Sequence, residues 1–481
     1  MTNTTCIRRC AWLIAWDRAA ERHQYLRDVD IAFTGNTIAF IGERYEGAVD
    51  DEIDGRRLFV LPGLINIHSH AALEPNYKGI REEHGVPEMY MTGLYERCAS
   101  MMPDVDGQRA GVEVTYAELL LSGVTTLADL SHPFPGWLDL AARSGMRIYL
   151  APWYASSVWY LENRHELKYR WDEAAGRSAF DDALRLIDEA DAHPCGRLSG
   201  MIAPAQIDTC TEDLLRDSLA AARERSRPFT THASQSVVEF ETMVRRHGKT
   251  PIQWAHEIGL LGDHTILGHA IFIDQHSWLH WATRDDLSLL AETETAIAHC
   301  PTPFARYGQM LEHIGRYARA GVRVGIGTDT VPHNMLEEMR WATVLGKISA
   351  EDISAVTMEE VFHAATAGGA TALVRDDIGR LAPGKKADLV LVDLQHPLMK
   401  PTRDPLRSLV FHGADRCVRD VYVDGIKVVE GGTVLTLDYE GAVDRVDEAQ
   451  RRMVEETPSR DYAGRSVDDI APLSIRMGGG A

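Results

Sequence analysis

The chain has 481 residues, of which 45% are hydrophobic and 25% charged, with 71 acidic against 50 basic side chains. This length and composition predict a globular protein with one large and one smaller domain. The formal net charge of −21 argues against nucleic acid and anionic membranes as partners, since both bind basic surfaces, and no segment is apolar for long enough to cross a membrane.

Short strands are predicted in the first 57 residues, with a turn at Gly35–Asn36 between the last two. They lie at residues 11–16, 29–33 and 37–41. We expect this region to form part of a small antiparallel sheet.

From residue 58 to residue 373, apolar runs typical of strands alternate with amphipathic segments typical of helices. Eight strand candidates occur, at residues 58–67, 124–130, 147–153, 198–203, 228–232, 265–269, 295–300 and 322–328. Eight strand–helix units predict an α/β fold of the (β/α)8 TIM-barrel type. The long segments 71–114 and 152–178 are expected to be inserted loops, which commonly build the pocket of a barrel.

Strands return after residue 373, at residues 387–393 and 418–423. We expect residues 1–57 and 374–436 to form one small β-sandwich domain from both chain ends, beside a barrel domain at residues 58–373. Residues 437–481 are expected to contain a charged helix and a polar tail that is poorly ordered at its end.

The seven cysteines contain no Cys-x-x-Cys pair, and their odd number argues against a disulfide framework. The apolar run at residues 11–16 is too short for the core of a signal peptide. Together these observations predict a cytoplasmic protein with reduced thiols.

Side chains that commonly bind metals close four of the predicted strands. His68 and His70 are two residues apart on the first strand, so both rings point to the same side. His232, His269 and Asp329 close strands five, six and eight, and in a barrel these ends open on one face. The chain has 20 histidines, so a single one carries little weight, but this joint placement predicts a site for Zn²⁺ or Fe²⁺.

The motifs around these residues resemble a known family. They are residues 62–70 (Pro-Gly-Leu-Ile-Asn-Ile-His-Ser-His), Gly268-His269-Ala270, His299-Cys300-Pro301, Gly327-Thr328-Asp329 and the segment 379–390. In combination they are similar to the amidohydrolase superfamily and, within it, to the cytosine deaminase and triazine hydrolase branch. The resemblance extends over about residues 1–436.

The resemblance implies a hydrolase with one divalent metal ion per active site. It assigns His68, His70, His232 and His269 as ligands, with Asp329 at or near the ion. Zn²⁺ is favoured, with Fe²⁺ or Mn²⁺ as alternatives. Relatives with two metals use a carboxylated lysine after strand four, and residues 201–204 contain no lysine, so a second metal is not expected. Family members usually self-associate, which predicts a homo-oligomer.

In the implied mechanism, metal-bound hydroxide attacks an electron-poor carbon of a flat nitrogen heterocycle and releases ammonia or an amine. Asp329 accepts the water proton and later returns it to the leaving group. His299, near the end of strand seven, donates a hydrogen bond to the nucleophile or to the developing oxyanion. The alternative for His299 is a packing histidine with no contact to the substrate.

The strand-five motif departs from the family pattern. Relatives usually have His-x-x-Glu there, whereas this chain has His232-Ala233-Ser234-Gln235, and glutamine cannot transfer a proton. Gln235 therefore favours a second reaction, the displacement of nitrite or halide, because these anions leave without being protonated. Gln235 is alternatively a polar contact to a substrate carbonyl. Glu74 is a candidate for the missing acid and for a substrate contact, or else a loop residue that faces water.

Aromatic residues are frequent after the third strand. Trp153 and Tyr154 are predicted to stack on a flat substrate. Four further aromatic residues either do the same or pack the insertions against the barrel: Trp159 and Tyr160 in the same loop, and Trp278 and Trp281 after strand six.

Four functions are thus open: an aminohydrolase acting on a nitrogen heterocycle, the displacement of nitrite or halide from such a ring, the hydrolysis of an amide, urea or carbamate, and a non-catalytic assembly role. The complete set of metal-binding side chains argues against the last. The substrate depends on the two long insertions, which contain no motif that identifies it.

Overall fold

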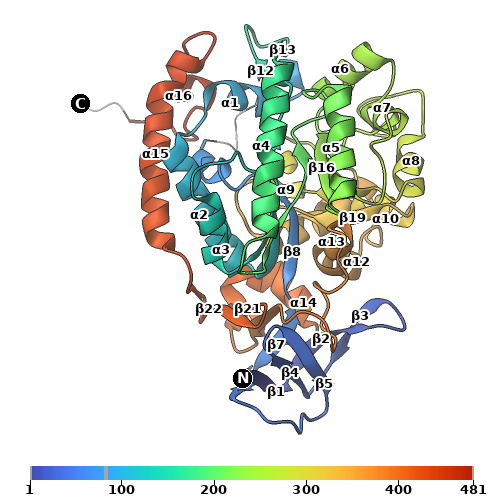
Figure 1. The fold of residues 1–481 in the computed structure, drawn as a ribbon, viewed down its shortest axis with the longest axis vertical. Helices are drawn as coiled ribbons and strands as arrows, with labels where there is room; N and C mark the ends of the chain where they lie inside the picture. The colour runs from blue at the N-terminus through green and yellow to red at the C-terminus, as the bar shows by residue number, and fades with distance from the viewer. Residues whose placement is uncertain (1–2, 81–84, 479–481) are drawn as a thin grey trace.

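Parallel strands with helices between them form the centre of this α/β protein in the computed structural model, which describes residues 3–80 and 85–478 (Figure 1). Within these ranges, eight of the parallel strands form two four-stranded sheets. One has the order β14-β10-β9-β8, with β8 (Leu64–Ser69), β9 (Val124–Asp129), β10 (Arg147–Leu150) and β14 (Leu198–Gly200). The other has the order β16-β17-β18-β19, with β16 (Phe229–Ala233), β17 (Thr265–His269), β18 (Ala296–His299) and β19 (Arg323–Ile326).

Isolated bridges connect these two sheets at their edges. Ile202, which follows β14, pairs in parallel with Phe229 of β16, and Ser69 of β8 pairs in parallel with Asp329, which follows β19. The carboxyl ends of the strands are therefore held on the same side of the molecule.

The strand predicted at residues 58–67 is divided at Gly63. β7 (Leu58–Pro62) belongs to an antiparallel sheet, whereas β8 begins at Leu64 in a parallel one. A Cβ atom on residue 63 would lie 2.0 Å from Oγ1 of Thr125, so only glycine allows the chain to pass between the two sheets there. An unbroken apolar run does not reveal this change of sheet, because both halves are buried.

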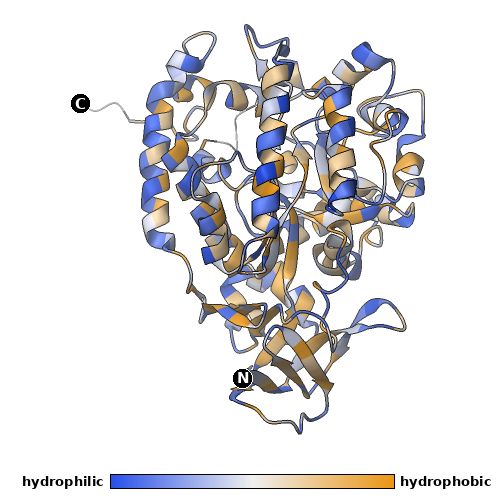
Figure 2. Ribbon diagram, viewed as in Figure 1, coloured by the Kyte–Doolittle hydropathy of each residue, from blue (hydrophilic) through white to orange (hydrophobic). Residues whose placement is uncertain are grey.

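Helices surround the parallel strands and turn their apolar sides inward (Figure 2). In α5 the buried Leu214, Leu215, Ser218 and Leu219 recur at helical spacing, and the side chain of Thr211 caps the first turn by accepting from Leu214 N. The helices are α2 (Val105–Leu121), α3 (Trp137–Ser144), α4 (Glu173–Asp191), α5 (Glu212–Glu224), α6 (Val237–His247), α7 (Pro251–Glu257), α8 (Asp286–Glu292), α9 (Pro301–Arg306), α10 (Ile314–Arg319), α11 (Met335–Ala350), α12 (Met358–His363) and α13 (Gly369–Ala372).

Strands from both chain ends share one sheet at the lower end of Figure 1. Its order is β23-β22-β21-β20-β7-β2-β3, with β2 (Trp12–Asp17), β3 (Arg22–Leu26), β20 (Leu389–Asp393), β21 (Val418–Val423), β22 (Ile426–Glu430) and β23 (Thr433–Val434). A second sheet, β5-β4-β1-β6, contains β1 (Thr4–Cys10), β4 (Val29–Thr34), β5 (Thr37–Gly42) and β6 (Asp51–Asp54). Ile7 and Ile31 of one sheet pack with Leu13, Val60 and Leu391 of the other.

The two long insertions lie beyond the carboxyl ends of the parallel strands, in the upper part of Figure 1. The first contains two short 3-10 helices, η1 (Glu74–Tyr77) and η2 (Pro87–Met89), and α1 (Leu94–Ser100). The second contains β11 (Trp153–Tyr154) and a hairpin of β12 (Ser157–Tyr160) and β13 (Lys168–Trp171); β11 pairs with β15 (Ala203–Pro204).

The chain ends in α15 (Tyr439–Arg460) and α16 (Val467–Ile470), which run along one side of the molecule (Figure 1). α15 packs on α2 through Ala442 and Val446. The last residues of the predicted tail, 479–481, lie outside the described part of the chain. A short helix, α14 (Pro405–Ser408), lies between β20 and β21. Among the described helices, none combines the length and apolarity needed to span a membrane.

Candidate metal centre and pocket

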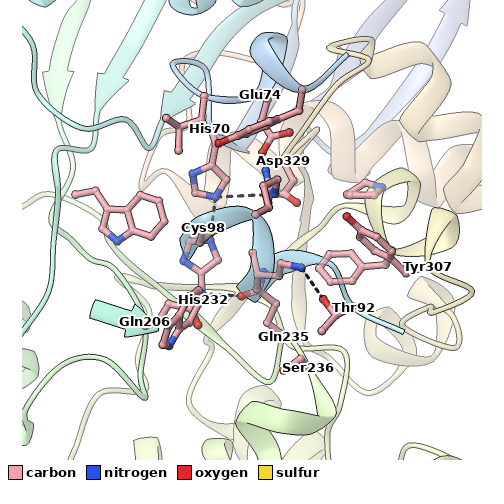
Figure 3. A pocket seen from close by; sticks show the side chains of 18 residues that line it. His70, Glu74, Thr92, Cys98, Gln206, His232, Gln235, Ser236, Tyr307 and Asp329 are labelled. Carbon is pink, nitrogen blue, oxygen red and sulfur yellow. Dashed lines mark hydrogen bonds and ion pairs between the residues drawn. The ribbon is translucent and has the colours of Figure 1, made fainter. Parts of the chain in front are cut away.

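The structure brings the four histidines and the aspartate together where β8, β16, β17 and β19 end. Oδ1 of Asp329 lies 3.4 Å from Nε2 of His68, 3.3 Å from Nε2 of His70 and 4.0 Å from Nε2 of His269. Nε2 of His70 lies 3.1 Å from Nε2 of His232. One ligand atom each from His68, His70, His232 and Asp329 lies within 4.8 Å of the others. Figure 3 shows His70, His232 and Asp329 converging on one point.

Main-chain hydrogen bonds orient these side chains. Nδ1 of His70 lies 3.0 Å from the carbonyl oxygen of Leu130, and Nδ1 of His232 lies 2.6 Å from that of Ala205. A ring that donates from Nδ1 to a carbonyl presents the lone pair of Nε2 to the centre. Asp329 N donates to His68 O at 2.9 Å, which sets the aspartate beside the first strand. The backbone of Asp329 has a positive φ of 56°, a strained conformation that is common at functional sites.

Burial determines the charges at this centre. It lowers the pKa of His70 to about 4, and it holds the pKa values of His232 and His269 well below the ordinary range. Burial alone would raise the pKa of Asp329, but the surrounding imidazoles, His269 first among them, outweigh it and hold this pKa well below its usual value. At neutral pH the rings of His70, His232 and His269 are therefore neutral, and Asp329 is ionised.

This set of donors fits a divalent cation. Both ring nitrogens of His68 and both of His269 are buried and have no hydrogen-bond partner among the described residues. An unsatisfied buried polar group costs about 1–3 kcal/mol, so a native protein rarely keeps several of them together without a partner. Neutral imidazoles and a carboxylate are ligands suited to Zn²⁺ and to other borderline metals. A divalent ion between these residues would give Nε2 of each ring a partner.

A pocket opens above the centre (Figure 3). Trp153 lies on one side of it, with its ring centroid 5.1 Å from that of His70. The lining consists of His70, Leu73, Glu74, Tyr77, Thr92, Leu94, Arg97, Cys98, Trp153, Trp159, Gln206, His232, Gln235, Ser236, Pro303, Phe304, Tyr307 and Asp329. Trp153, Gln235 and Glu74, three predicted substrate contacts, therefore all face this pocket.

Tyr154, the fourth predicted contact, does not line the pocket within the described residues. Its hydroxyl donates to Oγ of Ser218 at 2.8 Å, and its ring packs near Phe180 at 5.2 Å between centroids. Successive side chains on a strand point in opposite directions, so when Trp153 of β11 faces the pocket, Tyr154 faces the helices.

His299 is buried beside the centre but lines an adjoining pocket with Leu311 and His313. Phe304 lines both pockets. Burial lowers the pKa of His299 to about 4, so its ring is neutral at physiological pH.

The remaining aromatic candidates have different positions. Trp159 lines the pocket and also donates from Nε1 to Asp208 Oδ2 at 3.2 Å. Tyr160 lies under the guanidinium of Arg170, and Trp278 is 47% exposed. Trp281 packs against Phe240. Of these four, Trp159 alone lines the pocket among the described residues.

Gln235 is held by its neighbours rather than left free in the pocket. Its Oε1 accepts from Nε2 of Gln206 at 2.8 Å, which leaves its own amide N–H groups as donors. Its backbone N–H donates to Glu239 Oε2 at 2.8 Å, and Ser234 N donates to the other oxygen at 2.6 Å. Sequence reasoning missed Gln206, although its position just after β15, at the end of the fourth strand unit, was a usable signal.

Glu74 is not a loop residue that faces water. Its side chain is 1% exposed and forms an ion pair with Arg97, whose guanidinium lies 4.7 Å over the ring of Tyr77. Sequence reasoning also missed Arg97, because no pattern relates it to Glu74. The pocket wall beside the metal centre, where Glu74 N donates to His70 O at 3.3 Å, therefore carries a buried pair of opposite charges.

Glu239 predicts a pH dependence of stability. Burial, together with nearby Asp208, raises its pKa from 4.5 to about 8. The folded protein thus binds a proton that the unfolded chain releases between these pH values, so this residue lowers stability as the pH rises. We expect the melting temperature of Glu239→Gln to exceed that of wild type by an amount that increases as the pH is raised from about 5 to about 9. Thermal scanning at several pH values measures this difference.

Glu257→Gln is the matched control, because Glu257 is half-exposed and pairs with Lys249 at the surface. It should show no such trend. A Glu239→Gln variant that is less stable than wild type at every pH would show instead that the carboxylate is needed for its two backbone hydrogen bonds.

Comparison with known proteins identifies the family of this chain. The model of the amidohydrolase family matches residues 59–428. A 5-methylthioadenosine/S-adenosylhomocysteine deaminase of Natronomonas pharaonis is 30% identical over 434 residues, 89% of this chain and 94% of the relative. A protein of the same name from Haloarcula marismortui is 31% identical over 412 residues, 84% of this chain and 89% of the relative.

Solved structures are similar over nearly the whole chain. The atrazine chlorohydrolase TrzN from Arthrobacter aurescens TC1, complexed with zinc, has a TM-score of 0.77 at 25% identity and covers 93% of this chain and 100% of its own. An adenosine deaminase from Xanthomonas campestris with bound zinc has a TM-score of 0.78 at 22% identity, covering 93% and 98%, which shows a shared fold.

Proposed function

The chain belongs to the amidohydrolase family, and from this premise we propose that it is a mononuclear aminohydrolase that releases ammonia or an amine from a nitrogen heteroaromatic ring. It is a metal-dependent hydrolase of C–N bonds. One observation carries the proposal: buried imidazoles and a carboxylate converge at the base of a pocket lined by aromatic and amide side chains. The names of its relatives, deaminases of adenine compounds among them, support a ring substrate.

The ion would be held by the four histidines and the aspartate, His68, His70, His232, His269 and Asp329. Zinc is the favoured metal, because similar solved structures contain it. A divalent ion bound there lowers the pKa of water, which makes hydroxide available near neutral pH. The absence of a lysine at residues 201–204 supports a single metal.

The protein's own residues then have distinct tasks. Asp329, ionised at neutral pH, accepts the proton of the attacking water and returns it to the leaving group. Trp153 offers a flat face beside the centre. Gln235 donates its amide N–H groups to the ring substrate, with its orientation set by Gln206. His299 is proposed as a donor to the developing oxyanion, supported by its closeness to His269.

Gln235 specifically favours a second candidate function, the displacement of nitrite or halide from a heteroaromatic ring. An amide cannot protonate the ring or the leaving group, whereas these anions leave without a proton. One similar structure is a chlorohydrolase.

The decisive assay measures ammonia, amine, nitrite and chloride released from a panel of heterocycles, amides and ureas by the zinc-loaded protein. The panel should include 5-methylthioadenosine and chlorinated triazines. Ammonia or amine release from a heterocycle supports the first function. Release of nitrite or chloride alone supports the second, and turnover of amides or ureas alone contradicts both.

Restoring the family's usual acid is a sharper probe. We expect Gln235→Glu to leave deamination unchanged or to raise it, because a carboxyl group can protonate a ring nitrogen, and not to raise anion displacement. Rates on matched amino- and chloro-substituted rings test this. Gln395→Glu controls for the added charge, because Gln395 is exposed, does not line the pocket and already accepts from Nζ of Lys400 at 2.8 Å. A large loss of deaminase activity in Gln235→Glu would contradict this view of Gln235.

We also infer the finer architecture. Bridges at both edges of the parallel sheets support a closed (β/α)8 barrel at residues 58–373. The packing of two antiparallel sheets supports a small β-sandwich domain from residues 1–57 and 374–436, with 437–481 as a C-terminal helix and tail. The free cysteines support a cytoplasmic location.

A homo-oligomer is also proposed. The apolar side chains of Trp341, Ile348 and Ile353 are 40%, 63% and 84% exposed along and just after α11, which supports contact with a second copy. Light scattering of the purified protein measures the oligomeric state directly.

A further inference from the structure

The C-terminal segment, residues 439–470, packs against the back of the pocket wall. α15 approaches α2 and η1 closely, and a Cβ atom on Gly107 would lie 2.8 Å from Cβ of Ala449 and 3.1 Å from Oδ1 of Asn76. Met453 of α15 and Val467 of α16 belong to one buried cluster with Leu73, Tyr77 and Met101. Two of these residues, Leu73 and Tyr77, also line the pocket on their other side.

Gln450 of α15 binds the main chain of η1. Its Nε2 donates to the carbonyl oxygens of Asn76 and Lys78, both at 2.8 Å. η1 carries Glu74 and Tyr77, which line the pocket. One amide from the C-terminal helix therefore ties down the short helix that presents Glu74.

Arg465, in the loop between α15 and α16, binds α1 through Glu96. Its Nη2 lies 2.9 Å from Oε1 of Glu96, and the same guanidinium pairs with Asp461 at 2.8 Å. Glu96 is 4% exposed, and its chain neighbour Arg97 lines the pocket and pairs with Glu74. Arg465 and Gln450 thus hold the two elements that carry the partners of this ion pair.

No residue of 439–470 is among the described residues that line the pocket or make up the metal centre. We propose that Gln450 and Arg465 are positioning residues, through which the C-terminal segment holds the Glu74–Arg97 pair where substrate binds. The expected change in kinetics rests on the proposed function, but the stability of η1 and α1, which carry Glu74 and Arg97, can be measured without any substrate. A wall displaced by a fraction of an ångström weakens substrate binding, whereas the side chains of the metal centre keep their own main-chain hydrogen bonds, such as that between Nδ1 of His70 and the carbonyl oxygen of Leu130.

The test compares Arg465→Ala and Gln450→Ala with Arg465→Lys and Arg451→Ala in the full-length, zinc-loaded protein. Arg451 lies on the same helix but pairs with Asp447 at the surface, where both side chains are about two-thirds exposed. We expect Arg465→Ala and Gln450→Ala to raise KM about tenfold, with kcat within about twofold and zinc content unchanged. Arg465→Lys should recover most of the loss, and Arg451→Ala should match wild type.

Hydrogen exchange of residues 72–78 and 94–101 gives a readout that does not depend on activity. Protection there should fall in Arg465→Ala and Gln450→Ala, while the parallel strands keep theirs. Unchanged KM and unchanged exchange in both variants would overturn the proposal, as would a loss of kcat and zinc in parallel with a general loss of protection. If wild type turns over no substrate, the proposed function fails, and the exchange measurement still decides this inference.

Discussion

Replacing Asp329 by asparagine should lower kcat by a factor of about 10³ or more. The carboxylate is the ionised group of the centre, with Oδ1 within 3.4 Å of Nε2 in both His68 and His70. Asparagine has nearly the same shape but cannot accept the proton of the attacking water. General acid–base catalysis contributes about 10²–10⁴ in rate, and the loss of a metal contact adds to this effect.

Steady-state kinetics of Asp329→Asn, with zinc measured in the same preparation, test this expectation. Asp404→Asn is the matched control, because Asp404 caps α14 and accepts from Tyr25 far from the pocket lining. The control should keep full kcat. An Asp329→Asn enzyme that retains both its zinc and more than about a tenth of wild-type kcat would contradict the role given to this carboxylate.

Removing the metal should abolish activity, and one equivalent of Zn²⁺ should restore it. Without an ion, Nε2 of His68, Nε2 of His269 and the ionised Asp329 are left without a cation among them. The melting temperature should fall as well, because a ligand bound only by the folded state stabilises it by about 2.7 kcal/mol at a hundred times its Kd.

Dialysis against a chelator, followed by metal analysis, activity assay and a thermal scan, measures these effects together. Protein carried through the same dialysis and reloaded with zinc controls for damage. Full activity in a preparation shown to contain no metal would remove the basis of the proposed function. An unchanged melting temperature would show that the site is already satisfied without an ion.

The convergence of these five side chains could be predicted because it follows from local rules. His68 and His70 lie on one side of a strand by its twofold repeat, and His232, His269 and Asp329 each close an apolar run. Parallel strands then bring their carboxyl ends to one edge without further information. The same rule applied to the fourth strand would have found Gln206.

The pocket wall could not be predicted in this way, because its contacts join segments with no common pattern. Glu74 and Arg97 are 23 positions apart in irregular sequence, and Arg465 reaches Glu96 across 369 positions. The direction of Tyr154 also depended on packing, since Trp153 beside it is equally aromatic and only one of the two can face the pocket from a strand.

By itself, the sequence determined the α/β class, the family and the residues that converge at the centre, because each depends on periodicity, strand ends or local motifs. Only the tertiary structure decided that the chain changes sheets at Gly63, that Glu74 is buried against Arg97, and that Gln450 of the C-terminal helix binds the main chain of η1. These features arise from side chains distant in sequence that meet only after folding, so no local pattern records them.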